Sequence, residues 1–231
     1  MKPTLYSITA LSMLFFSCGQ PPATTTTTKA DTTTISIDTT QVRNADEAIA
    51  ALQAGNERFV AGKMVNTDYK TQIEKTKDGQ KPPTVILSCM DSRVPPEIVF
   101  DQGIGNLFVT RVAGNIADAN ILGSMEYATK VIGSKLIVVM GHNHCGAVKG
   151  AIANAELGNL TQLLAQIKPA ISHDSTDHEQ QIDETAKNNI KMTIDYILKN
   201  SEVINTLVKQ GAVKIKGAYY DIETGKVNFI D

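Results

Sequence analysis

The sequence lacks several features that mark other classes of protein. It contains no tryptophan and only three cysteines, and it has no internal repeat. Its 22 lysines and arginines are scattered along the chain and are outnumbered by 24 acidic residues, so the formal net charge is -2. Because no basic stripe is present for a phosphate backbone, we expect no nucleic-acid partner. No apolar run reaches the roughly twenty residues that cross a bilayer, so we expect no transmembrane helix.

The N-terminus has the pattern of an export signal. Lys2 precedes a mostly apolar stretch, residues 5–16, which is too short to span a membrane but suits the core of a signal peptide. The stretch leads to Ser17 and Cys18 and resembles a bacterial lipoprotein cleavage site. We therefore expect residues 1–18 to be a lipoprotein-like signal peptide with Cys18 lipidated. The alternative is an ordinary cleaved signal with a stray thiol.

A change of composition separates this signal from the rest of the chain. Residues 19–40 contain Pro21, Pro22 and two runs of threonine, with little to bury, and predict a disordered tether. Residues 41–231 are long enough for one domain with a sizeable core. The protein is thus expected to be exported to the periplasm or cell envelope, and its lipid anchor would be its membrane contact.

Hydrophobic periodicity in residues 41–231 predicts an α/β domain whose mainly parallel sheet is flanked by helices. Short apolar runs predict strands at residues 84–88, 107–112 and 136–140, and a closing strand and hairpin at 212–221 and 226–230. Helices are predicted from a cap at Asn44, from Asp118 or Asn120, over residues 184–198, and from Ser201. Glu47, three residues after Asn44, is expected to accept in return from the Asn44 backbone N–H. The segment 156–183 has weak periodicity.

Two short segments carry the chemistry. Cys89, Asp91 and Arg93 directly follow the strand at 84–88, and His142 and Cys145 follow the strand at 136–140. If these strands are parallel neighbours, both segments emerge at the carboxyl edge of the sheet, where open α/β sheets place their sites. Two thiolates and one imidazole form a set that suits zinc and leaves a fourth position open for catalysis.

These residues allow other interpretations. In an exported protein, the remaining two cysteines can also form a disulfide. His142 is favoured over His144 as the ligand because it leads the loop directly after the strand, and its spacing to Cys145 allows a chelate turn. A proton-relay role for His144 stays open. His173 and His178 lie in polar surroundings and are expected to be solvated.

Asp91 and Arg93 predict a gate beside such a metal. An unrestrained carboxylate two residues from a zinc thiolate would take the open fourth position, so Asp91 is itself a candidate ligand. The planar guanidinium of Arg93 can hold the carboxylate bidentately and keep it off the metal. Asp91 would then be free to accept a hydrogen bond from a metal-held hydroxide.

These motifs resemble the β-class carbonic anhydrase family. The likeness rests on CMDSR at residues 89–93 and GHNHCG at 141–146. It extends, in the family's order, over residues 94–97, 100–103, 107–109, 111–115, 124–128 and 217–221. The resemblance therefore covers nearly all of residues 41–231.

The resemblance implies one Zn2+ per chain on Cys89, His142 and Cys145, with Asp91 and Arg93 as the catalytic dyad. It implies a carbonic anhydrase, a zinc lyase that reversibly hydrates CO2 to bicarbonate and a proton by attack of zinc hydroxide. It also implies a homodimer or a larger even-numbered homo-oligomer. One subgroup has a tryptophan-dependent bicarbonate site, which is not expected in a chain without tryptophan.

Two alternatives to this function follow from the same residues. The fold can act on carbon disulfide or a similar small electrophile, as relatives of the family do. The chain can also be a non-enzymatic, lipid-anchored binding module stapled by a Cys89–Cys145 disulfide.

Overall fold

The computed structural model describes residues 42–175 and 177–230. The expected signal peptide with Cys18, the whole of the expected tether and the expected domain boundary lie outside this part. Within the described residues, no helix combines the length and the hydropathy needed to cross a membrane.

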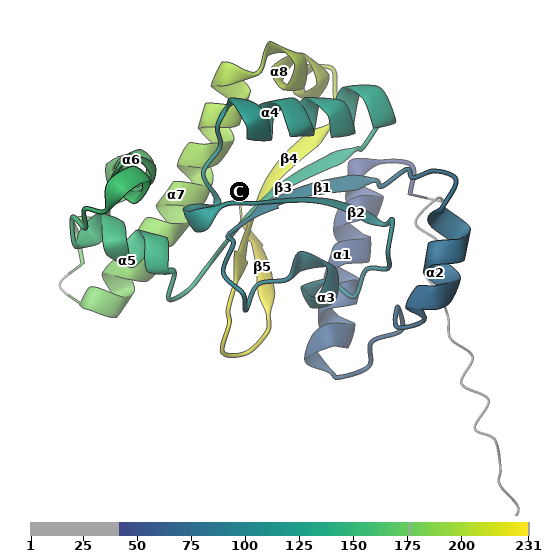
Figure 1. Ribbon diagram of the computed structural model, residues 1–231, viewed down its shortest axis with the longest axis horizontal. Coiled ribbons are helices and arrows are strands. Elements are labelled where there is room, and N and C mark those ends of the chain that lie inside the picture. The colour runs from purple at the N-terminus through teal and green to yellow at the C-terminus, as the bar shows by residue number, and fades with distance from the viewer. Residues whose placement is uncertain (1–41, 176, 231) are drawn as a thin grey trace, which may run out of the picture. The chain divides into compact units, whose positions relative to one another are not determined.

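A five-stranded sheet forms the centre of the described domain (Figure 1). Its strands are β1 (Thr84–Ser88), β2 (Leu107–Arg111), β3 (Leu136–His142), β4 (Lys214–Tyr220) and β5 (Val227–Ile230), in the spatial order β2-β1-β3-β4-β5. Strands β1 to β4 are parallel, and β5 pairs antiparallel with β4. The expected α/β fold with a mainly parallel sheet is confirmed, and all five expected strands are present.

Helices cover both faces of this sheet (Figure 1). They are α1 (Ala45–Val60), α2 (Tyr69–Thr76), α3 (Pro96–Val99), α4 (Ala119–Glu126), α5 (Gly146–Ile152), α6 (Gly158–Ile167), α7 (His178–Asn200) and α8 (Glu202–Lys209). Three shorter helical segments lie in the connections between these elements. They are the 3-10 turns η2 (Ala113–Asn115) and η4 (Lys168–Ala170), and the π-helical η3 (Tyr127–Ile132).

Strands β1 and β3 are buried along their whole length because both of their faces are covered. Successive side chains of a strand point to opposite faces. Val85 and Leu87 of β1 accordingly join a core with α4 to α8, whereas Ile86 joins a second core with α1 and α3. These buried strands hold the residues that follow them in a rigid position.

Helix α7 lies unusually close to the sheet. A Cβ atom added to Gly141 of β3 or to Gly217 of β4 would lie 2.9 Å from a side-chain carbon of Ile190. The two glycines therefore let the middle of α7 approach the ends of the strands. This approach brings α7 residues beside the carboxyl edge of the sheet.

The helix starts follow local capping chemistry, with one correction. The Asn44 side chain accepts a hydrogen bond from the Glu47 amide, as expected, and α1 begins there. The Glu47 carboxylate, however, accepts from the backbone N–H of Arg43 and not from that of Asn44. Asp118 is the cap of α4, and its carboxylate accepts from the two amide groups at 120 and 121.

The segment 156–183 contains more helix than its weak periodicity predicts. Helix α6 buries Leu164 and Ile167, and α7 begins at His178, one turn and a half before the predicted start at Glu184. The first turn of α7 is polar and exposed, so hydrophobic spacing carried no signal there. The Asp177 side chain, which accepts from the Gln180 amide, sets the start instead.

Candidate metal centre

Three potential ligands meet at the carboxyl edge of the sheet. Cys89 directly follows β1, His142 is the last residue of β3, and Cys145 is the N-cap of α5. Because β1 and β3 pair in parallel, with Ser88 opposite Met140, their ends lie side by side. The two sulfurs and an imidazole nitrogen all lie within 4.8 Å of one another. The structure thus brings together three of the predicted site residues from two separate segments.

The three side chains are almost fully buried, with exposures of 4 % for Cys89, 0 % for His142 and 1 % for Cys145. The His142 Nδ1 lies 2.7 Å from the carbonyl oxygen of Asn143. A carbonyl oxygen only accepts, so Nδ1 carries the proton and Nε2 presents a lone pair. Among the described residues, this buried Nε2 has no hydrogen-bond partner. A buried acceptor without a donor is costly in a native fold, and a metal ion would satisfy it.

The two thiols influence each other strongly. The hydrogen bond from the Cys145 thiol is the main cause that lowers the pKa of Cys89, to about 4. The Cys89 thiolate in turn raises the pKa of Cys145. In the absence of a metal, the pair therefore holds one proton between two sulfurs. A divalent cation would displace that proton, because coordinated thiols are deprotonated.

The donor set fits zinc. Two thiolates and one neutral imidazole are common zinc ligands, and a set of three leaves a fourth position for chemistry. In the described part of the chain, Cys89 and Cys145 are free cysteines, and no disulfide joins them. The stapled arrangement considered from the sequence is therefore not the one that the structure adopts.

Asp91 and Arg93 form the bidentate pair expected from the sequence. Arg93 Nε donates to Asp91 Oδ1 at 2.9 Å, and Arg93 Nη2 donates to Oδ2 at 2.7 Å. These side-chain hydrogen bonds are the main reason that the pKa of the Asp91 carboxyl lies well below its ordinary value. Asp91 Oδ2 remains 3.9 Å from His142 Nε2, so the carboxylate stands beside the three ligands while Arg93 holds it.

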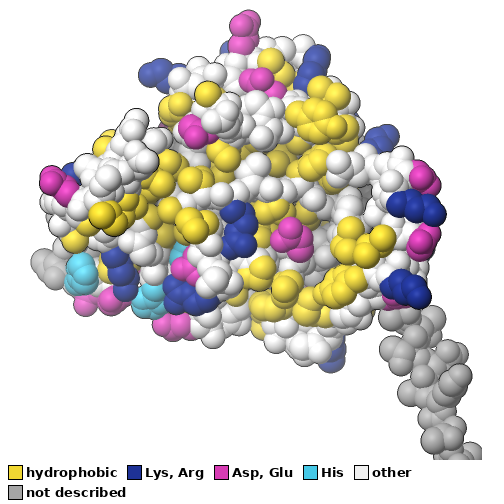
Figure 2. Space-filling model, viewed as in Figure 1, with side chains coloured by type: hydrophobic (Ala, Val, Ile, Leu, Met, Phe, Trp, Pro, Cys, Tyr) yellow, Lys and Arg dark blue, Asp and Glu magenta, His cyan; other side chains and the backbone are white. Residues whose placement is uncertain are grey.

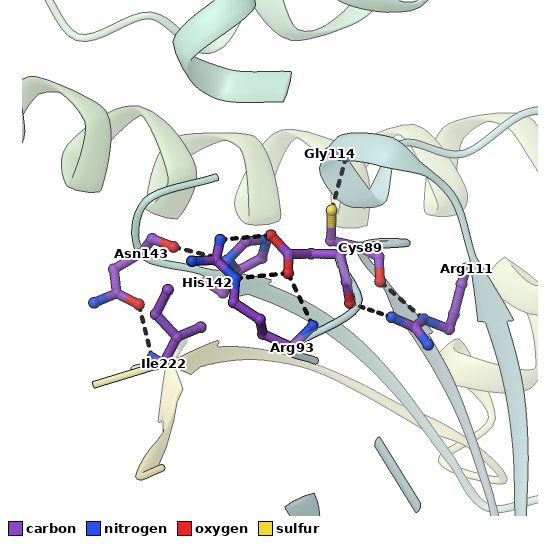
Figure 3. Close-up of polar contacts among 8 residues, drawn as sticks. Cys89, Arg93, Arg111, Gly114, His142, Asn143 and Ile222 are labelled. Atoms are coloured by element: carbon purple, nitrogen blue, oxygen red, sulfur yellow. Dashed lines mark hydrogen bonds and ion pairs between the residues drawn. The ribbon is translucent and has the colours of Figure 1, made fainter. Parts of the chain in front are cut away.

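Backbone contacts fasten the loop that carries Cys89 (Figure 3). Arg111, at the end of β2, donates from Nε to the carbonyl oxygen of Cys89 at 3.0 Å and from Nη2 to that of Asp91. The Gly114 amide donates to the Cys89 sulfur at 3.4 Å. Sequence reasoning placed Arg111 near the end of a strand but gave it no role. Arg111 pairs with Ser88 in the parallel register of β1 and β2, which places it next to the loop that begins at Cys89.

His144 points to a different environment from that of His142. Its backbone is left-handed, with φ of 52°, and its two ring nitrogens lie 3.1 Å from Glu179 and 2.9 Å from Glu223. The ring is therefore engaged by carboxylates on both sides. This geometry agrees with setting His144 aside as a ligand.

Asn143, which lies between His142 and His144, connects this loop to the segment just after β4. Its side-chain NH2 group donates to Asp221 Oδ1 at 3.1 Å. Its side-chain oxygen accepts from the Ile222 amide at 2.8 Å (Figure 3). This long-range link was not anticipated from the sequence. The remaining histidines, His173 and His178, are exposed, as expected.

Comparisons with known proteins agree on one family. The family model described as "Carbonic anhydrase" matches residues 84–227, more than half of the chain. Carbonic anhydrase 2 of Mycobacterium tuberculosis is 37% identical in an alignment 185 residues long that covers 76% of this chain and 88% of that protein. The carbonic anhydrase of Mycolicibacterium smegmatis is 34% identical, over 77% of this chain and 89% of its own. A tetrameric β-carbonic anhydrase of Sordaria macrospora matches with a TM-score of 0.65 and 25% identity, over 80% of this chain and 98% of that structure.

Proposed function

Because the chain belongs to the β-class carbonic anhydrase family, we propose that its buried Cys89, His142 and Cys145 centre catalyses the reversible hydration of CO2 to bicarbonate and a proton. One observation carries this proposal. The unpartnered Nε2 of His142 converges with two sulfurs, and a carboxylate held by Arg93 stands directly beside them.

The residues have separate tasks in this reaction. Cys89, His142 and Cys145 would hold one Zn2+, which supplies an activated water at neutral pH and so a nucleophile for CO2. The hydrogen bond from His142 Nδ1 to the Asn143 carbonyl keeps the imidazole in the tautomer that can bind a metal. Arg93 keeps Asp91 ionised and directed, so that Asp91 can accept a hydrogen bond from the reacting water.

The decisive experiment is stopped-flow CO2 hydration by the zinc-loaded protein. Cys89→Ser should abolish hydration, because it removes a ligand, whereas His173→Ala should keep it, because His173 is exposed in the segment before α7. Zinc-loaded wild type without CO2 hydration would overturn the proposal. Turnover of carbon disulfide by that inactive preparation would assign the centre to the alternative substrate.

A homo-oligomer is part of the proposal. Strand β2 lies at one edge of the sheet in the described domain, and hydrophobic side chains are spread over the face that carries it (Figure 2). Ile98 and Ile104 are exposed and line one hollow together with Leu107 of β2. Tyr127, also exposed, packs against Phe108 of β2, and the exposed Val131 follows it in η3. An apolar face of this kind beside an open strand edge is typical of a subunit interface. The Sordaria macrospora relatives are tetrameric, which supports an even-numbered assembly here.

Export and lipidation complete the proposal. Their support is the sequence of residues 1–18, with an apolar stretch that ends at Ser17 and Cys18. We expect the full-length protein to fractionate with membranes and to take up labelled fatty acid. Cys18→Ser should release it into the soluble fraction, and membrane association of that variant would contradict the anchor.

A further inference from the structure

The Cys89 sulfur receives a hydrogen bond from a turn that belongs to another part of the chain. The Gly114 amide, in η2 just after β2, donates to Cys89 Sγ at 3.4 Å (Figure 3). Such a bond draws electron density from a thiolate and fixes the direction in which the sulfur points. Groups that contact a metal ligand in this way orient it and tune its binding strength.

The turn that presents this amide is tightly constrained. Gly114 is left-handed, with φ of 68° and ψ of 18°. A Cβ atom there would lie 2.4 Å from Ile167 Cδ1 and 3.3 Å from Ala147 Cβ. Glycine is thus required at this position both by its conformation and by the space available. Glycine has no side chain of its own to hold its backbone, so contacts from other residues must keep its two peptide groups in place.

Asn189 of α7 supplies that contact. Its side chain is completely buried, and Nδ2 donates to the Gly114 carbonyl at 2.7 Å. We propose that Asn189 is a positioning residue for the metal centre, because it holds the Gly114 turn so that the turn's amide points at the Cys89 sulfur. The proposal rests on the function proposed above, since it takes Cys89 to be a zinc ligand.

The burial of Asn189 supports this role over simple packing. Within the described residues, its Oδ1 is buried and has no hydrogen-bond partner. An unpartnered buried amide oxygen is unfavourable, and a leucine of similar size would avoid it. Asparagine at this position therefore supplies a donor at the cost of a buried oxygen without a partner among the described residues. The donor's partner is the carbonyl of the same glycine whose amide contacts Cys89.

The test compares two neighbouring asparagines of α7. Asn188 donates to the Ala170 carbonyl at 3.3 Å, away from the thiols, and is the matched control. Zinc affinity of the full chain is measured by chelator competition, and the thiolate-to-metal absorption band is recorded after Co2+ is substituted. We expect Asn189→Leu to weaken zinc binding by about 10- to 100-fold and to shift the Co2+ band, because the sulfur loses its oriented donor. Asn188→Leu should retain wild-type affinity and band.

Three results would overturn the role. If Asn189→Leu melts at a lower temperature without zinc but keeps the wild-type affinity and Co2+ band, Asn189 only stabilises the fold. If Asn189→Leu does not fold, Asn189→Ser is used, and wild-type affinity and band in that variant likewise contradict the role. A wild-type protein that binds Co2+ without a thiolate band would overturn the metal centre itself together with this inference.

Discussion

Arg93 donates hydrogen bonds to both carboxylate oxygens of Asp91, at 2.9 and 2.7 Å, while Asp91 Oδ2 lies 3.9 Å from Nε2 of His142. A carboxylate this close to an open coordination position is a potential inhibitor of its own site. The bidentate bond changes it into a directed acceptor. Half of the Arg93 side chain is exposed, so the pair can be tested without disturbing the core.

The first prediction concerns this pair. Arg93→Ala should retain zinc but lower CO2 hydration at least about 100-fold, because Asp91 is no longer held as an acceptor and can bind the metal. Stopped-flow hydration and zinc content are measured on the same preparation. Arg93→Lys should also be impaired, because an ammonium group lacks the planar fork. Arg43→Ala, which removes an exposed arginine that also pairs with a carboxylate, is the control. Near-normal rates in Arg93→Ala would remove the gate from the mechanism.

The second prediction is a pH dependence of stability. Hydrogen bonds from Arg93 lower the pKa of Asp91 in the folded protein. A carboxyl of this kind stabilises the fold above its unfolded pKa of about 3.9, and the contribution is lost as the pH falls through the folded pKa. Asp91→Asn should therefore reduce the stability of the zinc-free protein by up to about 1 kcal/mol at pH 7. Urea unfolding should show the difference shrinking below about pH 4. A difference that is independent of pH would indicate lost packing instead of lost charge.

The third prediction separates the two histidines of the loop. His142→Ala should weaken zinc binding by more than about 100-fold, because it removes a buried ligand and not merely a neighbour of one. His144→Ala should keep zinc, since its ring lies between Glu179 and Glu223. Zinc is quantified after dialysis against a chelator. Equal loss in both variants would contradict the assignment of His142 alone.

The fourth prediction concerns the zinc-free thiols, studied in a Cys18→Ser background. The hydrogen bond from the Cys145 thiol lowers the pKa of Cys89 to about 4. The reduced, zinc-free protein should therefore show the ultraviolet absorbance of one thiolate at pH 7, which disappears as the pH falls through about 4. Cys145→Ser weakens the main donor and should move the transition toward the ordinary thiol value, about 8.5. Absence of any thiolate signal at pH 7 in the unmodified pair would refute this coupling.

The fifth prediction tests the proposed interface. Val131 is 67% exposed, and its neighbour Tyr127 packs edge-on against Phe108 of β2, with 6.3 Å between the ring centres. Val131→Glu places a charge in this apolar face and should shift the protein toward the monomer in size-exclusion chromatography with light scattering. Leu157→Glu, at an equally exposed apolar position before α6, is the control. An unchanged mass for Val131→Glu would place the interface elsewhere.

Several features of the molecule were readable in the sequence because they are local. The apolar runs in β1 and β3 predict buried parallel strands. The polar residues that follow these runs mark the carboxyl edge of the sheet, where Cys89 and His142 lie. The Asp91–Arg93 pair is also local, since its members are two residues apart. The start of α7 was misplaced because its first turn is solvated, and a solvated turn shows no hydrophobic period.

The sequence by itself therefore determined where the strands lie along the chain and which residue types form the zinc centre. It also determined the Asp91–Arg93 pair beside that centre. Tertiary structure decided what long-range contacts supply. Strand pairing brought two separate ligand segments together, so that their donor atoms lie within 4.8 Å of one another, and set Arg111 against the Cys89 loop. The packing of α7 on the sheet also brought the Asn189 side chain within hydrogen-bonding distance of the Gly114 carbonyl, 75 residues away in the chain. No local pattern encodes such contacts, because they depend on how closely α7 can approach the sheet, and that distance is set by packing.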